Sequence, residues 1–365
     1  MSFWNRRTSI DALNNIDERH RLKRTLRWPH LVAFCVFDMV CTVIYTLIGV
    51  GAGRAGPAVI LAFLVAGVVC ACAALCYAEL ATMMPAAGSA YTYTYAVGGE
   101  LIAWVVGWSL ILEYSVVCSA VAVGWSGYAV GFLETIGIHL PHWLTAGPHA
   151  GGVVNLPAVV ILFAVAGMLM LGTRESATVN AFLVVFKVAA LLLFILIAAK
   201  AFNGANFTPF MPHGFAAHAE GTEVRGVMAA AAIIFFAFYG FDAVSTAAEE
   251  TVDPKRDLAR GIIGSMIVCT LLYMLVAAAA LGAMNYEQFS ASPEPLAYIL
   301  RTLGSPLAAT LIAAAAVIAL PTVILAFMYG QSRIFFVMAR DGLLPERLGS
   351  INARRGTPVA MILVT

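Results

Sequence analysis

Long apolar runs separated by short polar stretches dominate the chain from residue 30 onward. A helix that crosses the hydrocarbon core of a bilayer needs about 20 predominantly apolar residues. The pattern therefore predicts eight complete membrane-spanning helices and the start of a ninth at Pro358. The eight runs lie near residues 30–51, 57–82, 100–134, 154–172, 177–199, 226–247, 262–284 and 306–338.

The composition supports an all-α integral membrane protein. Hydrophobic residues make up 61% of the chain and charged residues 11%, with a mean hydropathy of +0.89. Soluble domains carry about 25% charged residues. The net charge of +1 gives no reason to expect a nucleic-acid partner. The seven cysteines lie in apolar runs without the spacing of a zinc site, so we expect neither a metal nor a cofactor.

Lysine and arginine are unevenly distributed between the two sets of loops. If the basic tail, residues 1–29, is cytoplasmic, sixteen of the 21 Lys and Arg face the cytoplasm and four face outside. The four external residues are Arg54, Lys200, Arg225 and Arg301. Positive residues prefer the cytoplasmic side. We therefore expect a multi-pass protein of the cell (inner) membrane, with both ends of the present chain in the cytoplasm.

The sixth apolar run contains an interruption. The stretch 235–250 reads FFAFYGFDAVSTAAEE, with Gly240 and Asp242 inside an apolar segment. Irregular backbone at membrane depth is tolerated only where it is buried in protein or lines a cavity. The stretch therefore predicts a broken helix beside a binding cavity. The alternative is a continuous buried helix with one satisfied aspartate.

Ionisable residues within the predicted spans that we take as functional candidates are Asp38, Glu113, Lys187 and Asp242, while Glu79 lies nearer a helix end. Charges at membrane depth are costly and mark functional sites by default. Lys187 lies near the middle of its span, where its amine cannot easily reach either interface. It is therefore a candidate for a group that exchanges protons, with a structural ion pair as the alternative.

Several long blocks resemble the amino acid–polyamine–organocation (APC) transporter superfamily, most closely the bacterial relatives of cationic amino acid transporters. The blocks are AGPAVILAFLVAG (55–67), CYAELATMMPAAGSAYTYTYAVGGELIAWVVGWSLILEY (76–114), FFAFYGFDAVSTAAEE (235–250) and GQSRIFFVMARDGLLPERL (330–348). The resemblance implies a LeuT-like fold of two inverted five-helix repeats. Residues 30–200 would form the first repeat. Residues 226–365 would form an incomplete second repeat, with three full helices and the start of a fourth.

The resemblance also implies a binding site. Helices one and six would be unwound at mid-membrane around an amino acid substrate. The implied substrate-binding residues are Met39, Val40, Cys41, Thr42, Val43, Glu113, Phe236, Ala237 and Tyr239. Lys187 matches the proton-coupling lysine of the family, and Asp38 and Asp242 are candidate modulators.

Two features depart from the family pattern. The first helix lacks glycine at four positions, where Cys35, Phe37, Cys41 and Val43 stand, and Asp38 is an added charge. Helices nine to twelve of the usual family member are missing from the sequence. We expect Asp38 to pair with Lys187 and to hold its proton.

The sequence therefore predicts a secondary active transporter that moves amino acids, preferably cationic ones, with proton coupling by alternating access. Its partners would be the amino acid, protons and the lipid bilayer. The alternatives are a truncated or inactive homologue, or a membrane amino acid sensor that does not transport. We expect no enzyme, since GxSxG, HExxH and paired catalytic acids are absent from the sequence.

The topology can be tested by cysteine labelling. After removal of the native cysteines, a cysteine at Gly151 should react with an impermeant thiol reagent added outside intact cells. The reason is that the loop 136–153 is predicted to be external. Protection of this cysteine, together with labelling of one at Ser2, would contradict the assignment.

Overall fold

The computed structural model describes residues 27–39, 42–83, 89–171, 177–240, 251–345 and 359–364, and most of them are helical. The α-helices are α2 (Trp28–Met39), α3 (Thr42–Ala55), α4 (Val59–Met83), α5 (Ser89–Gly98), α6 (Glu100–Thr135), α7 (His142–Thr145), α8 (Leu156–Leu171), α9 (Ala177–Ala198), α10 (Val227–Ile234), α12 (Pro254–Ala283), α13 (Tyr286–Phe289), α14 (Pro295–Thr302), α15 (Pro306–Arg340) and α16 (Val359–Val364). Short 3₁₀ turns are η3 (Gly56–Ala58), η4 (Pro148–Ala150), η5 (Ala199–Ala201), η6 (Gly204–Phe207) and η7 (Phe235–Phe238).

Where the structure describes them, the predicted apolar runs are mostly helical. Because lipid offers no hydrogen-bond partners, the helix satisfies these backbones within the segment itself. Within the described ranges, four helical stretches are long and apolar enough to cross a membrane: Ile44–Leu80, Glu100–Thr135, Arg256–Ala283 and Pro306–Ser332. The first contains a turn at η3, where Gly56 adopts a φ of +63°. The chain is therefore a helical membrane protein, and its internal repeat symmetry remains a prediction.

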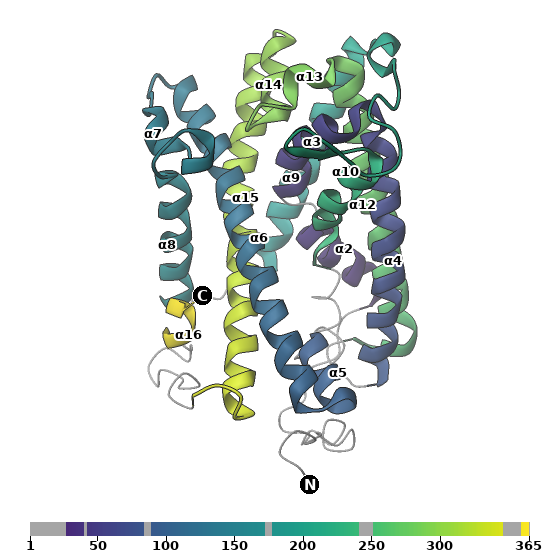
Figure 1. Cartoon of the computed structure of the whole chain (residues 1–365), viewed down its shortest axis with the longest axis vertical. Helices are drawn as coiled ribbons and strands as arrows, with labels where there is room; N and C mark the ends of the chain where they lie inside the picture. Colours follow the sequence, from purple (N-terminus) through teal and green to yellow (C-terminus); the bar gives the residue numbers. More distant parts are fainter. Residues whose placement is uncertain are drawn as a thin grey trace.

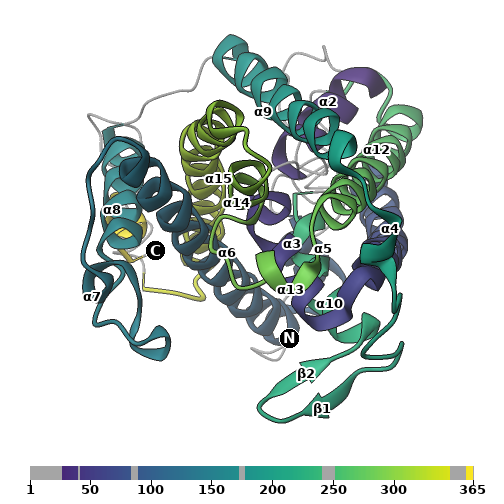
Figure 2. The same ribbon diagram turned by 90° about the horizontal axis from the view of Figure 1, so that it is seen from above.

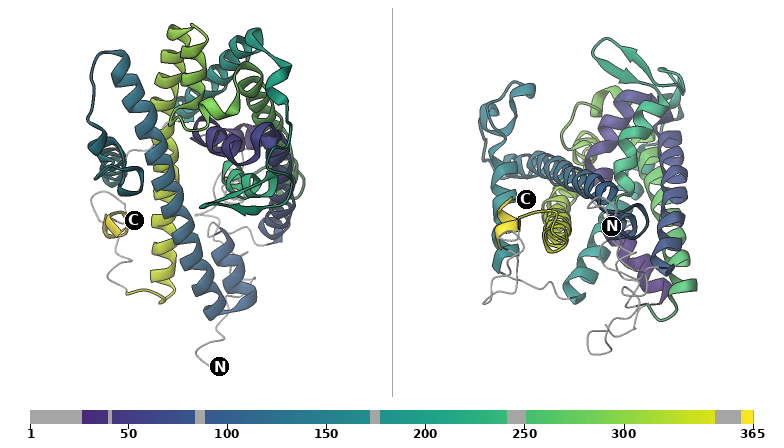
Figure 3. Two further views of the ribbon diagram at one scale, coloured as in Figure 1. Left: turned by 45° about the horizontal axis from the view of Figure 1, so that its top comes forward. Right: turned by 60° about the horizontal axis from the view of Figure 1, so that its bottom comes forward.

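The helices form two packed groups that share one bundle. In the first group, α12 packs against α4 and α2, and α10 packs against α4 and α3. In the second, α6 lies along α15, and α8 flanks both of them on one side of the bundle (Figures 1 and 3). Figure 2 looks down α15 and shows α6 crossing it obliquely. The 36 residues of α6 are more than the roughly 20 that an upright span needs.

A proline inside α15 has a compensating contact. Pro321 has no N–H to donate to the carbonyl of Val317, one turn earlier in the helix. The indole Nε1 of Trp125 on α6 donates to that carbonyl at 2.9 Å. A side chain of the neighbouring helix therefore supplies the hydrogen bond that the proline removes.

The loop between α9 and α10 contains a two-stranded antiparallel hairpin, formed by β1 (His218–Glu220) and β2 (Glu223–Arg225). It is visible in Figure 2 at the edge of the bundle. The guanidinium of Arg54, at the end of α3, donates to the Val224 carbonyl at 2.8 Å, and Gly226 N–H donates to the Arg54 carbonyl at 2.9 Å. The loop thus ties the end of α3 to the start of α10. The hairpin is a small exception to the all-α prediction.

Glycines in the bundle allow close helix contacts that can be tested. A Cβ at Gly67 on α4 would lie 2.5 Å from Thr270 Oγ1 and 3.3 Å from the Phe238 ring. A Cβ at Gly167 on α8 would meet no atom within 4 Å. We predict that Gly67→Val lowers the stability in detergent by about 1–3 kcal/mol, the usual cost of overpacking. Size-exclusion chromatography after heating would measure the loss.

Gly167→Val is the matched control, because it places the same side chain in the middle of another apolar helix. It should retain nearly the thermal stability of the unmodified chain. Equal losses for the two variants would show that the steric fit at Gly67 is not what limits stability.

Candidate functional site

The sixth apolar segment changes conformation where the sequence predicts a break. The α-helix α10 passes into the 3₁₀ turn η7, which ends at Phe238. Tyr239 is extended, with ψ of 143°, and Gly240 has a φ of +113°. Only glycine adopts such a φ without strain, which explains the residue at this position. The interruption at Gly240 is confirmed, while Asp242 lies outside the described residues.

The first apolar segment is described as α2, up to the buried Met39, and as α3, from Thr42 onward. Val40 and Cys41 lie outside the described residues, and so do the side chains of Asp38, Thr42 and Val43. The predicted pairing of Asp38 with Lys187 therefore stays a prediction.

A tyrosine on α12 brings these two segments together. The hydroxyl of Tyr273 lies within hydrogen-bond distance of the Met39 carbonyl at the end of α2. It also lies 3.2 Å from the Ala237 carbonyl in η7. Two segments 198 positions apart in the chain (39 and 237) thus direct carbonyl oxygens toward one point.

Aromatic rings surround this point. The Tyr273 ring packs against Phe63 of α4 and Phe238 of η7, with centroid distances of 5.7 and 5.5 Å. Phe236 and Tyr239 are half-buried, and their rings meet edge to face at 4.9 Å. The described surroundings of the two helix ends are therefore backbone carbonyls framed by apolar rings.

Lys187 lies inside the bundle, with only 1% of its surface exposed. Its Nζ donates to Thr322 Oγ1 of α15 at 3.1 Å, and the Thr322 hydroxyl donates to the Ala319 carbonyl at 2.8 Å. The prediction of a buried mid-helix lysine is correct. The pairing with Thr322 was not foreseen, because residues 135 positions apart share no local pattern.

Lys187 also adjoins the first apolar segment. The Tyr45 hydroxyl, one turn into α3, donates to the Lys187 backbone carbonyl at 3.2 Å. The Tyr128 hydroxyl of α6 donates in turn to the Tyr45 carbonyl at 2.6 Å. The lysine is therefore held between α3, which begins just after the undescribed residues 40–41, and α15. Glu113 is half-buried on α6, and its relation to the two helix ends stays a prediction.

Known proteins resemble this chain along most of its length. The sequence pattern of the amino acid permease family matches residues 26–365. A branched-chain amino acid permease of Bacillus subtilis is 44% identical over 98% of this chain and 76% of its own length. A methylthioribose transporter of the same organism is 38% identical over 98% of this chain and 76% of its own length. A vacuolar cationic amino acid transporter of Arabidopsis thaliana is 37% identical over 99% of this chain and 56% of its own length.

The chain belongs to the amino acid permease family of the APC superfamily. It is a membrane transporter and not an enzyme.

Sequence reasoning missed Tyr273 of this permease. A tyrosine in the apolar stretch LLYMLVAAAA reads as a packing residue. One signal was available, because a buried tyrosine hydroxyl needs a hydrogen-bond partner. On a continuous helix, whose own backbone is satisfied, that partner is found on a neighbouring segment with free carbonyls.

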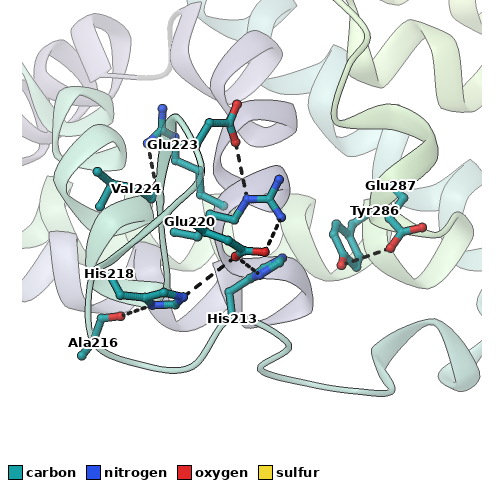
Figure 4. Close-up of polar contacts among 10 residues, drawn as sticks. His213, Ala216, His218, Glu220, Glu223, Val224, Tyr286 and Glu287 are labelled. Atoms are coloured by element: carbon teal, nitrogen blue, oxygen red, sulfur yellow. Dashed lines mark hydrogen bonds and ion pairs between the residues drawn. The ribbon is translucent and has the colours of Figure 1, made fainter.

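A separate polar pocket lies at the far end of α3. It has a volume of ≈ 290 Å³ and is lined by Gly53, His213, Arg225, Tyr286, Glu287 and Ser290. Figure 4 shows Glu220 beside His213. The Glu220 oxygens lie 3.1 Å from His213 Nδ1 and 3.5 Å from Arg225 Nη1. Burial, with a smaller contribution from nearby Glu287, raises the pKa of Tyr286.

This pocket is distinct from the two helix ends. Gly53 lies eleven residues beyond Thr42 along α3, or about 16 Å at the rise of an α-helix. The helix ends, rather than this pocket, carry the carbonyls expected for a substrate site.

The conformation of Gly240 yields a prediction. A φ of +113° is not open to alanine, so Gly240→Ala should shift the backbone of η7 and weaken amino acid binding by tenfold or more. The rise in melting temperature that an added amino acid causes in the purified permease would measure this loss of binding. Gly304→Ala is the control, because Gly304 also has a positive φ, +73°, but lies at the end of α14. If an amino acid stabilises Gly240→Ala against heat as much as it stabilises the unmodified permease, the prediction is contradicted.

Proposed function

We propose that this permease is a secondary active transporter that takes up amino acids with proton coupling by alternating access. The observation that carries the proposal is the meeting of the Met39 and Ala237 carbonyls beside Tyr273. Backbone carbonyl oxygens carry partial negative charge and suit the ammonium group that every amino acid has. The resemblance to the family implies that backbone amides near residues 40–43 would hold the substrate carboxylate.

Lys187 is the proposed proton carrier. The Thr322 hydroxyl gives its proton to Ala319, so its lone pairs accept an N–H from Nζ. A neutral amine still has two N–H groups, so this contact persists in both protonation states. The lysine can therefore change its charge without losing its position. A proton moving down 100 mV supplies about 2.3 kcal/mol, which corresponds to roughly fiftyfold accumulation.

Two classes of substrate side chain are candidates. A cationic side chain is favoured by the acid Glu113, by Asp242 and by the similarity to plant cationic transporters. A branched-chain side chain is favoured by the rings of Phe236, Phe238 and Tyr239 near the helix ends. The bacterial relative at 44% identity, a branched-chain permease, also favours it. A sensor that binds without transporting is the alternative from another class.

Uptake into proteoliposomes tests the proposal. Accumulation of labelled arginine or leucine should require an inward proton gradient. Unlabelled lysine should compete if the substrate is cationic, and unlabelled isoleucine or valine if it is branched-chain. Saturable amino acid binding without uptake would favour the sensor. If the protein neither binds nor takes up amino acids, the alternative of an inactive homologue is favoured.

Coupling is tested by Lys187→Ala. The variant should lose the dependence of uptake on the pH gradient, while the affinity for the amino acid changes by only a fewfold. Lys200→Ala is the matched control, because Lys200 follows the same helix but is exposed. Proton-driven uptake that is unchanged in Lys187→Ala would contradict the assigned role.

A further inference from the structure

Tyr273 is placed to do more than fill space. It lies on α12, a continuous helix of 30 residues, and its side chain is fully buried. Phe63 and Phe238 hold its ring on two sides. The position of the hydroxyl is therefore fixed by packing and by a backbone that is itself uninterrupted.

The Tyr273 hydroxyl lies within hydrogen-bond distance of both the Met39 carbonyl and the Ala237 carbonyl. This one oxygen therefore links the two segments directly. Because Met39 O and Ala237 O each lie within hydrogen-bond distance of the same oxygen, they are within about 6 Å of each other, twice a hydrogen-bond length. A tyrosine hydroxyl has one proton to donate. It is shared between the two carbonyls, and each keeps a lone pair for another donor.

We propose that Tyr273 is a positioning residue that fixes the Met39 and Ala237 carbonyls relative to each other, so that both present to one substrate ammonium. The inference rests on the proposed function. Without the hydroxyl, the two carbonyls would lose the donor that they share among the described residues, and substrate binding would have to order them. The residue therefore lowers the ordering cost of binding, as pre-organised sites do.

A purely structural role makes a different prediction. If only the ring matters, phenylalanine at position 273 preserves the contacts with Phe63 and Phe238 and changes nothing else. If the hydroxyl positions the carbonyls, the same substitution weakens substrate binding while the bundle stays folded. Because Tyr273→Phe removes only the hydroxyl oxygen, it distinguishes the positioning role from the packing role.

The experiment compares wild type, Tyr273→Phe and Tyr91→Phe of the full chain in proteoliposomes. Tyr91 is a matched control, because its hydroxyl is also buried, but it donates to Asp341 at 2.9 Å in the separate core formed by α5, α6 and α15. We expect Tyr273→Phe to raise the KM for uptake about tenfold with a smaller change in maximal rate. Tyr91→Phe should leave the KM within twofold of wild type.

An unchanged KM in Tyr273→Phe overturns the proposal, and so does an equal rise in both variants. Should Tyr273→Phe fail to fold, Tyr273→His retains a ring and an N–H donor. A folded histidine variant with a KM within threefold of wild type supports the positioning role, and one with a tenfold higher KM overturns it. Wild-type protein that takes up no amino acid would instead refute the proposed function, so the two failures are distinguishable.

Discussion

The need to satisfy backbone hydrogen bonds away from water shapes this molecule. Continuous helices such as α6 and α12 meet the need internally. Elsewhere a side chain from a continuous helix adds a donor to a backbone carbonyl. Tyr273 donates to the carbonyls of Met39 and Ala237, and Trp125 donates to the carbonyl of Val317, which Pro321 leaves without its usual donor. The continuous helices thus support carbonyls on the segments that pack against them.

The backbone carbonyls and the side chains around them would have different roles in substrate recognition by the permease. Backbone carbonyls at the helix ends match the ammonium group common to all amino acids, and they carry no information about the side chain. Discrimination between amino acids must come from the residues that surround the carbonyls. Those described are aromatic and apolar, including Phe236 and Tyr239.

The buried lysine illustrates the cost of charge in the same environment. An amine inside the bundle needs partners, and Lys187 receives one from Thr322 through its Nζ. Its backbone carbonyl accepts from Tyr45, which links the lysine helix α9 to α3. The proposed proton carrier is therefore in contact with the first broken segment, which is where coupling to substrate binding would have to act.

The sequence by itself determined the helical membrane character, the interruption at Gly240 and the mid-helix position of Lys187. These features follow from local hydropathy and from the conformational freedom of glycine, both of which are properties of consecutive residues. The identity of the family also followed from the sequence, because long blocks of residues carry it.

Only the tertiary structure decided which side chains meet. Tyr273 and Met39 are 234 positions apart, and Lys187 and Thr322 are 135 apart. Hydrophobic periodicity states which residues are buried, but it does not state which buried donor faces which free carbonyl. That choice depends on how helices pack, and packing is set by all of their contacts together.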